Sequence, residues 1–151
     1  MPRIADVMRL RVVSVQPNES VQVAIARMLE ENVGSVAVTE GDRLIGIFTE
    51  RDVLRLAGHG DALGEVAVST VMTTSLVTVS PDDEVLEAAR LMGARQIRHL
   101  PVVQDGNVLG IVGIRDVLSS LVERVWREHD DAAHDTARAL LGRRADASAA
   151  G

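Results

Sequence analysis

Apolar and polar residues follow the same succession of patterns twice along the chain. In the first half, a short alternating segment ends at Pro17, which lacks the N–H that a sheet ladder needs. Apolar residues then recur at the spacing of an amphipathic helix, and two short apolar runs separated by Gly41 and Asp42 predict a hairpin. The expected elements are a strand at 13–15, a helix over 21–29, strands at 36–39 and 44–48, and a helix from Glu50.

The second half has the same pattern because the chain resembles itself at a shift of 64 residues. Residues 7–54 align with 71–118 without a gap, so that Gly46, for example, falls on Gly110. The Gly-rich polar stretch 56–69 is expected to connect the two copies. The second copy predicts a strand at 77–79, a helix over 85–92, strands at 100–103 and 108–112 around an Asp105-Gly106 turn, and a helix from Ile114.

We expect an α/β (α+β) fold in which two β-α-β-β-α repeats pack pseudo-symmetrically. A half of about 50 residues buries too little apolar surface to be stable alone, so the halves must pack on each other. Two equivalent clefts then lie between them, where ligands usually bind. The expected boundaries are 1–60 for the first repeat, 61–128 for the second, and 129–151 for a helical, partly disordered tail.

Composition removes several classes of function. The chain has no cysteine, and all 16 basic residues are arginine, which excludes disulfides, thiolate metal sites, a P-loop lysine and Schiff-base chemistry. The net charge of −6 argues against nucleic acid as a partner. No apolar run reaches the roughly 20 residues of a membrane span. We therefore expect a cytoplasmic protein without membrane or nucleic-acid contacts.

Catalytic and metal-binding patterns are not apparent. No serine lies in a Gly-x-Ser-x-Gly turn, and no carboxylate pair has an acid–base context, so we expect no enzyme activity. His129 and His134 lie five residues apart in an acidic stretch, a spacing that separates two side chains on a helix. We expect a solvated polar face there and no metal site.

Two motifs resemble those of the CBS domain family. Residues 46–52, Gly-Ile-Phe-Thr-Glu-Arg-Asp, resemble its Gly-hydrophobic-x-hydrophobic-Thr/Ser-x-x-Asp signature. Residues 95–102, Arg-Gln-Ile-Arg-His-Leu-Pro-Val, resemble the strand that faces this signature. The resemblance covers about residues 4–124 and implies a small stand-alone CBS pair, or Bateman module, which binds a ligand between its repeats and catalyses no reaction.

The turn from Thr49 to Asp52 has chemistry that suits a sugar phosphate. The Thr49 hydroxyl is expected beside free N–H groups at a helix start, which favour anions. The Asp52 carboxylate, in the first turn of that helix, can accept hydrogen bonds from both hydroxyls of a ribose. In the CBS family the Asp binds ribose, the Thr or Ser contacts phosphate, and hydrophobic strand residues hold adenine; Arg98 would be the main phosphate clamp. The resemblance implies a ligand site formed by Ile47, Thr49, Asp52, Val77, Arg98, His99 and Pro101.

The other cleft is expected to be a weaker site. Gly113 stands where the first repeat has its threonine, so the hydroxyl is missing although Asp116 is kept. The facing wall offers Gly34 and Ser35 in place of the Arg-His pair. The second, weaker site would therefore comprise Ser14, Gly34, Ser35 and Asp116.

The resemblance implies a sensor of AMP, ADP or ATP, and alternatives stay open. The cleft could remain empty in a structural or protein-interaction module, or it could hold S-adenosylmethionine or a dinucleotide. Asp52 could also serve only as a carboxylate that complements a helix N-terminus. In the same way, Arg98 could be a solvated charge at a strand edge and His99 a structural residue.

An apolar stripe continues past the end of the second repeat, farther than a small half-domain needs for its own core. CBS modules typically dimerise through these helices, so a homodimer through the repeat helices is expected, with an effector protein that the sequence does not identify. Residues 131–144 are expected to form a further short helix. The stripe consists of Ile114, Val117, Leu118, Leu121, Val122, Val125 and Trp126.

Overall fold

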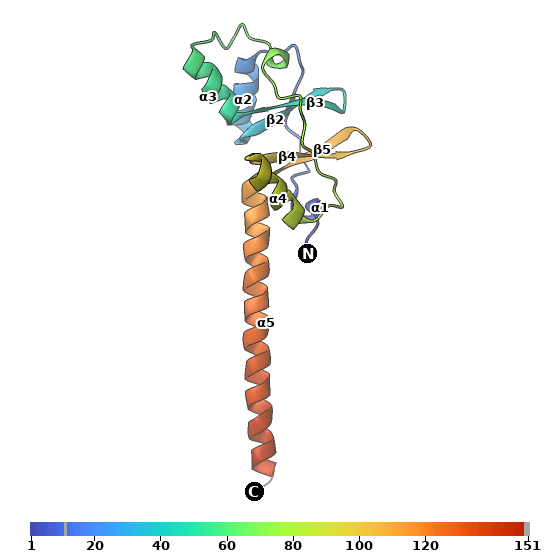
Figure 1. Ribbon diagram of the computed structural model, residues 1–151, viewed down its shortest axis with the longest axis vertical. Helices are drawn as coiled ribbons and strands as arrows, with labels where there is room; N and C mark the ends of the chain where they lie inside the picture. The colour runs from blue at the N-terminus through green and yellow to red at the C-terminus, as the bar shows by residue number, and fades with distance from the viewer. Residues whose placement is uncertain (11, 150–151) are drawn as a thin grey trace.

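The computed structural model describes residues 1–10 and 12–149, with side chains described as far as Leu141. It confirms the mixed α/β fold and the β-α-β-β-α order of the first half (Figure 1), while the second half has the order α-β-β-α. The second helix of each half begins as expected, at Glu50 and at Ile114. The elements are α1 (Ile4–Val7), β1 (Ser14–Val15), α2 (Val21–Glu31), β2 (Ser35–Glu40), β3 (Arg43–Thr49), α3 (Glu50–His59), the 3-10 helix η1 (Val68–Thr70), α4 (Val85–Arg95), β4 (His99–Gln104), β5 (Asn107–Gly113) and α5 (Ile114–Ala149).

The five strands are ordered β1-β2-β3-β5-β4 and come from two antiparallel hairpins, β2–β3 and β4–β5. The hairpins meet only near their tips, where Arg43 pairs with Asn107. The tips turn tightly because Gly41, Asp105 and Gly106 adopt positive φ, as the predicted hairpin residues allow. The expected first strand of the second repeat is reduced to a single parallel bridge between Val79 and Val102.

The core is divided into two clusters that follow the repeats only in part. One cluster surrounds Phe48, and the other includes Leu100 and Ile4, all three fully buried. Ile4 belongs to the first repeat in sequence but packs in the core of the second. Conversely, Val68, which follows the expected boundary at 60/61, packs in the core of the first. The two core clusters therefore do not coincide with the two stretches of sequence that form the repeats.

The segments around Ile4 and Val68, each of which packs on the other half of the chain, make equivalent contacts in the two repeats. Arg3 forms a bridge with Glu84, and Ala67 forms the equivalent bridge with Ser20, 64 residues away in each case. The same segments continue as arms along the hairpins, where Thr73 exchanges two backbone hydrogen bonds with Ile47, at 2.9 and 3.0 Å. Each repeat is thus completed by a strap from the other half, which ties the two halves together.

Glycine is required where an arm crosses the second hairpin. A Cβ on Gly110 would collide with the backbone carbonyl oxygen of Arg9. On Gly46 the collision would be with the side chain of Met72, which is flexible and can move. The glycine that opens the signature in each repeat is therefore explained by the close approach of an arm.

Helix α5 is a single element of 36 residues that includes residues 129–149 of the expected tail. In Figure 1 it runs out of the domain as a straight rod, and its second part lies beside no other described element. The expectation of a separate short helix over 131–144 is wrong, because the helical pattern continues without a break from the second repeat. Residues 150 and 151, part of the end expected to be disordered, lie outside the described residues.

Candidate functional site

The predicted Thr49–Asp52 turn is formed at the junction of β3 and α3. Thr49 caps α3, and Asp52 turns its carboxylate back toward the cap. Asp52 Oδ2 accepts hydrogen bonds from the Thr49 backbone N at 2.9 Å and from Thr49 Oγ1 at 3.3 Å. Asp52 is only 6% exposed. The reciprocal contacts of this capping box hold hydroxyl and carboxylate together before any ligand arrives.

A depression of about 280 Å³ opens beside Asp52. Arg55, on the next turn of α3, places its guanidinium 3.7 Å from Asp52 Oδ1. Arg55 is not among the site residues predicted from the sequence, although its spacing of three residues from Asp52 places both on one face of a helix. The lining residues are Asp52, Arg55, Leu56, His59, Asp61 and Val71.

The Arg98–His99 pair lies at the start of β4, and His99 is close to the start of β2 and the start of α3. A Cβ on Gly34 would lie 3.0 Å from His99 Nε2 and 3.1 Å from Glu50 Oε1, so His99 and Glu50 both approach the Gly34 backbone. Arg98 is exposed and its carbonyl accepts the Ile114 backbone N–H at 2.8 Å. The second repeat therefore brings His99 close to Gly34 and to Glu50, the residue that follows Thr49.

His99 is half-buried and surrounded by charge. Burial lowers the pKa of its imidazole below the ordinary value. The carboxylates of Glu50 and Asp116 act in the opposite direction on this pKa, while Arg98 lowers it further. The group is thus held in its neutral form by loss of water, although carboxylates from both repeats favour its charged form.

The remaining predicted first-site residues are spread over both halves. Ile47 is 8% exposed on β3. Pro101 is buried in β4, where its carbonyl accepts the Val79 N–H at 3.0 Å, and Val77 packs against the core of the second half. Among the described residues, the depression beside Asp52 is lined by none of Val77, Arg98, His99 and Pro101. The structure thus brings Thr49 and Asp52 together, and places His99 near Glu50, without joining all seven residues in one cavity.

The second predicted site has an equivalent turn at the start of α5, with fewer polar side-chain groups that could bind a ligand. Gly113 replaces the hydroxyl residue, and its backbone N lies 3.4 Å from Asp116 Oδ2, longer than the matching contact in the first repeat. Ser35 is buried and Gly34 half-buried. Ser14, in β1, has its carbonyl bound by Arg27 at 2.9 Å. The turn at Asp116 thus has a carboxylate but lacks the hydroxyl that Thr49 supplies in the first repeat.

Other kinds of site receive no support from the described part of the chain. Within it, no three His, Asp or Glu side chains gather where they could hold a metal ion. No helix of the described residues is both long and apolar enough to cross a membrane.

Comparison with known proteins agrees with this architecture. The sequence profile named CBS domain matches residues 4–59 and again 68–123. The chain belongs to the CBS domain family. The CBS domain-containing protein YhcV of Bacillus subtilis is 39% identical over 118 residues, which cover 78% of this chain and 84% of YhcV. By contrast, the match to inosine-5′-monophosphate dehydrogenase of Korarchaeum cryptofilum, at 36% identity and 70% of this chain, covers 21% of that enzyme.

Solved structures show the same CBS pair. The CBS-domain containing protein ATU1752 from Agrobacterium tumefaciens superposes with a TM-score of 0.73 at 31% identity, over 79% of this chain and 98% of that one. A CBS domain protein from Pyrobaculum aerophilum, complexed with AMP, has a TM-score of 0.73 at 24% identity, over 81% of this chain and 99% of that one. This CBS pair therefore has the fold of proteins that bind small ligands, and its described residues form the CBS repeats and the α5 extension alone.

Proposed function

We propose that this CBS pair is a regulatory sensor that binds an adenine nucleotide between its repeats and performs no chemistry on it. The observation that carries the proposal is the preformed Thr49–Asp52 turn, with its buried Asp52 carboxylate. His99 of the other repeat approaches Gly34 and Glu50 next to this turn, which supports a site shared by the two repeats. Asp52 would bind the ribose hydroxyls, and Thr49 with the α3 N–H groups would hold a phosphate oxygen. AMP, ADP and ATP all carry these groups.

The wall of the second repeat would complete the site. Arg98 has an exposed guanidinium that can reach a phosphate in a bidentate contact. His99 would add a ring N–H beside it. Ile47, Val77 and Pro101 would hold the adenine ring between apolar surfaces, which requires the two halves to shift relative to one another around the ligand.

Known relatives of this fold support a ligand of this chemical class. The Pyrobaculum aerophilum protein was solved with AMP, and the CBS domain pair of the protein MJ0100 with 5′-methylthioadenosine and S-adenosyl-L-methionine, at 22% identity and a TM-score of 0.76. All three ligands share an adenosine. They differ in the group attached to the ribose, and only AMP carries a phosphate there. A phosphate contact of Arg98 would therefore favour AMP over the other two ligands.

A ligand that bridges both repeats would favour one orientation of the halves, and this population shift would be read by a partner protein. Leu54 and Leu118 occupy equivalent positions in the two repeats and are 74% and 52% exposed. We place a homodimer contact on these repeat helices, where it would transmit the shift. We place the protein in the reducing cytoplasm, in keeping with its lack of cysteine.

Thermal stabilisation by a ligand series tests the proposal. We expect AMP, ADP or ATP to raise the melting temperature of the protein, and guanine nucleotides to do so much less. Arg98→Ala should weaken the response to phosphorylated ligands by at least about tenfold in Kd, while 5′-methylthioadenosine and S-adenosylmethionine lose little. Arg95→Ala, which removes an exposed arginine at the end of α4, is the matched control and should change neither response.

The outcomes separate the candidate functions. Equal losses for phosphorylated and phosphate-free ligands in Arg98→Ala would contradict the phosphate assignment. A response to S-adenosylmethionine alone would assign the cleft to that ligand. If no adenosine compound shifts the melting temperature at any concentration, the nucleotide proposal fails and a protein-interaction module with an empty cleft takes its place.

A further inference from the structure

His99 and Gly113 lie opposite each other in the second hairpin, as Ser35 and Thr49 do in the first. The register pairs His99 with Gly113 across β4 and β5, and Ser35 with Thr49 across β2 and β3. The first hairpin therefore sets a small, buried serine beside a threonine, whereas the second sets an imidazole beside a glycine. Because Gly113 has no side chain, there is room beside it for the larger ring of His99.

The imidazole of His99 lies between two members of the second predicted site, Gly34 and Asp116. A Cβ on Gly34 would lie 3.0 Å from His99 Nε2 and 3.1 Å from His99 Cε1. A Cβ on Gly113 would lie 3.9 Å from Cδ2 of the same ring and 3.6 Å from Asp116 Oδ2. One part of the ring therefore faces the Gly34 backbone, and another part faces the turn that carries Asp116.

Charged groups from both repeats lie around this ring. The Cβ position on Gly34 that is close to His99 Nε2 is also 3.1 Å from Glu50 Oε1, at the start of α3. Burial lowers the pKa of His99, Glu50 and Asp116 oppose this effect, and Arg98 adds to it. The half-buried ring is thus held between the two repeats, since each of them contributes groups that surround it.

We propose that the His99 ring fills the second cleft and excludes a ligand from it. This inference rests on the proposed function, because it takes the first cleft as a nucleotide site. A ribose that approached Asp116 as it would approach Asp52 needs the space beside Gly113, which the imidazole occupies. The chain therefore binds one nucleotide, at the turn of the first repeat, and removal of the ring creates a second site.

The opened cleft would hold an adenosine without selecting for a phosphate. The Asp116 carboxylate can accept hydrogen bonds from the ribose hydroxyls. The residue equivalent to Arg98, however, is Gly34, so this position offers no guanidinium to a phosphate. Adenosine and AMP should therefore bind the second cleft with affinities within about threefold of each other, whereas the first cleft prefers AMP.

The missing hydroxyl at Gly113 is the rival explanation for an empty second cleft. A Cβ on Gly113 would meet its nearest neighbours at 3.6 to 4.0 Å, which are ordinary contact distances, so Gly113→Ser can restore a hydroxyl there. If the hydroxyl decides, Gly113→Ser opens the second cleft and His99→Ser does not. If the ring decides, His99→Ser opens it, and adding Gly113→Ser to that variant only strengthens binding.

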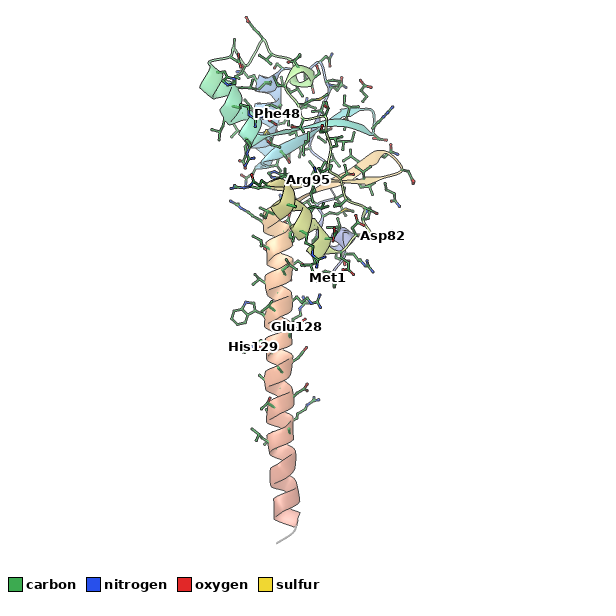
Figure 2. All side chains as sticks on the ribbon, viewed as in Figure 1. Met1, Phe48, Asp82, Arg95, Glu128 and His129 are labelled. Atoms are coloured by element: carbon green, nitrogen blue, oxygen red, sulfur yellow. The ribbon has the colours of Figure 1, made fainter. Side chains whose placement is uncertain are left out.

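Counting the ligands bound per chain by isothermal titration calorimetry, with AMP and with adenosine, tests the proposal. We expect one AMP per chain in the natural protein and two in His99→Ser, which copies Ser35 of the first repeat. Loss of the ring N–H should weaken the first site by about 2- to 10-fold. Adding Asp116→Asn to His99→Ser should return the count to one. His129→Ser is the matched control, because Figure 2 shows His129 on α5 well beyond the repeats, and it should keep the natural count.

The outcomes separate this inference from the function on which it rests. If the natural protein binds no adenosine compound, the proposed function fails and the inference fails with it. If the natural protein binds one AMP and His99→Ser also binds one, the function stands and the inference is overturned. Two AMP per chain in the natural protein, or a second site in Gly113→Ser alone, overturns it as well.

A measurement without ligand covers the case in which His99→Ser does not fold. Titration of the histidine rings by NMR follows His99 in the natural protein and in Asp116→Asn. Because the Asp116 carboxylate raises the pKa of His99 against the effect of burial, Asp116→Asn should lower this pKa further. An unchanged pKa would place the ring away from Asp116 and would overturn the inference.

Discussion

Replacing Asp52 by asparagine removes the charge on which both the turn and the proposed ribose contact depend. The asparagine keeps one oxygen that can accept from the Thr49 N–H, now 2.9 Å away, so the cap weakens without collapsing. Loss of a capping interaction typically costs about 0.5–2 kcal/mol. Arg55 adds little to this cost, since its side chain is 63% exposed and water screens the contact. For a chain of 151 residues, the unliganded melting temperature should fall by about 1–8 °C.

The effect on ligand binding should be larger than the effect on folding. A hydrogen bond to a charged group contributes about 1.5–3 kcal/mol, and the Asp52→Asn side chain can no longer accept from two hydroxyls with full charge. The Kd of an adenine nucleotide should rise about 10- to 100-fold. A nucleotide supplied at about 100 times the original Kd stabilises the unmodified protein by about 2.7 kcal/mol, and the variant by about 0.4–1.4 kcal/mol. Thermal unfolding with and without nucleotide measures both quantities in one experiment.

The second repeat provides the contrast. Asp116 occupies the equivalent position but has Gly113 in place of the threonine and a longer backbone contact. Asp116→Asn should therefore leave most of the nucleotide-induced stabilisation intact. If the two variants lose the nucleotide response equally, the asymmetry between the clefts is wrong. If Asp52→Asn keeps the full response, the ribose contact is wrong.

Two further predictions concern packing and pH. Gly110→Ala should lower the free energy of unfolding by about 1–3 kcal/mol, because the new methyl group meets the Arg9 carbonyl, whereas Gly93→Ala on the open face of α4 should raise it by about 0.5–1 kcal/mol. Urea titration compares the two, and a neutral Gly110→Ala would mean that the arm does not press on β5. His99 has a folded-state pKa below its unfolded value, so it contributes stability that is present above the unfolded pKa of about 6.5 and is lost as pH falls through the folded pKa. Unfolding of His99→Gln should depend less on pH in this window than unfolding of the natural protein, and an equal dependence would contradict the role of His99.

The local features of the fold followed from patterns of a few residues. The hairpins and the helix starts at Glu50 and Ile114 were predicted, because side-chain period and turn chemistry act between close neighbours in sequence. The Thr49–Asp52 turn was found for the same reason, since its two members are one helical turn apart. The internal repeat also indicated that two similar halves must share a core. The Arg98–His99 wall was assigned through a family resemblance, because no local pattern places it near Glu50.

Contacts between distant segments were decided by the tertiary structure alone. Ile4 carries no periodic signal that would send it into the core of the other half, yet it is fully buried there. The depression lined by Arg55 and Val71 likewise depends on how the connector returns over α3. Only the tertiary structure shows that α5 extends straight out of the domain and that its apolar residues are exposed. A helical pattern in the sequence does not say whether another element covers the helix. Local propensity acts over a few residues, whereas burial and the meeting of the two repeats depend on the whole chain packing at once.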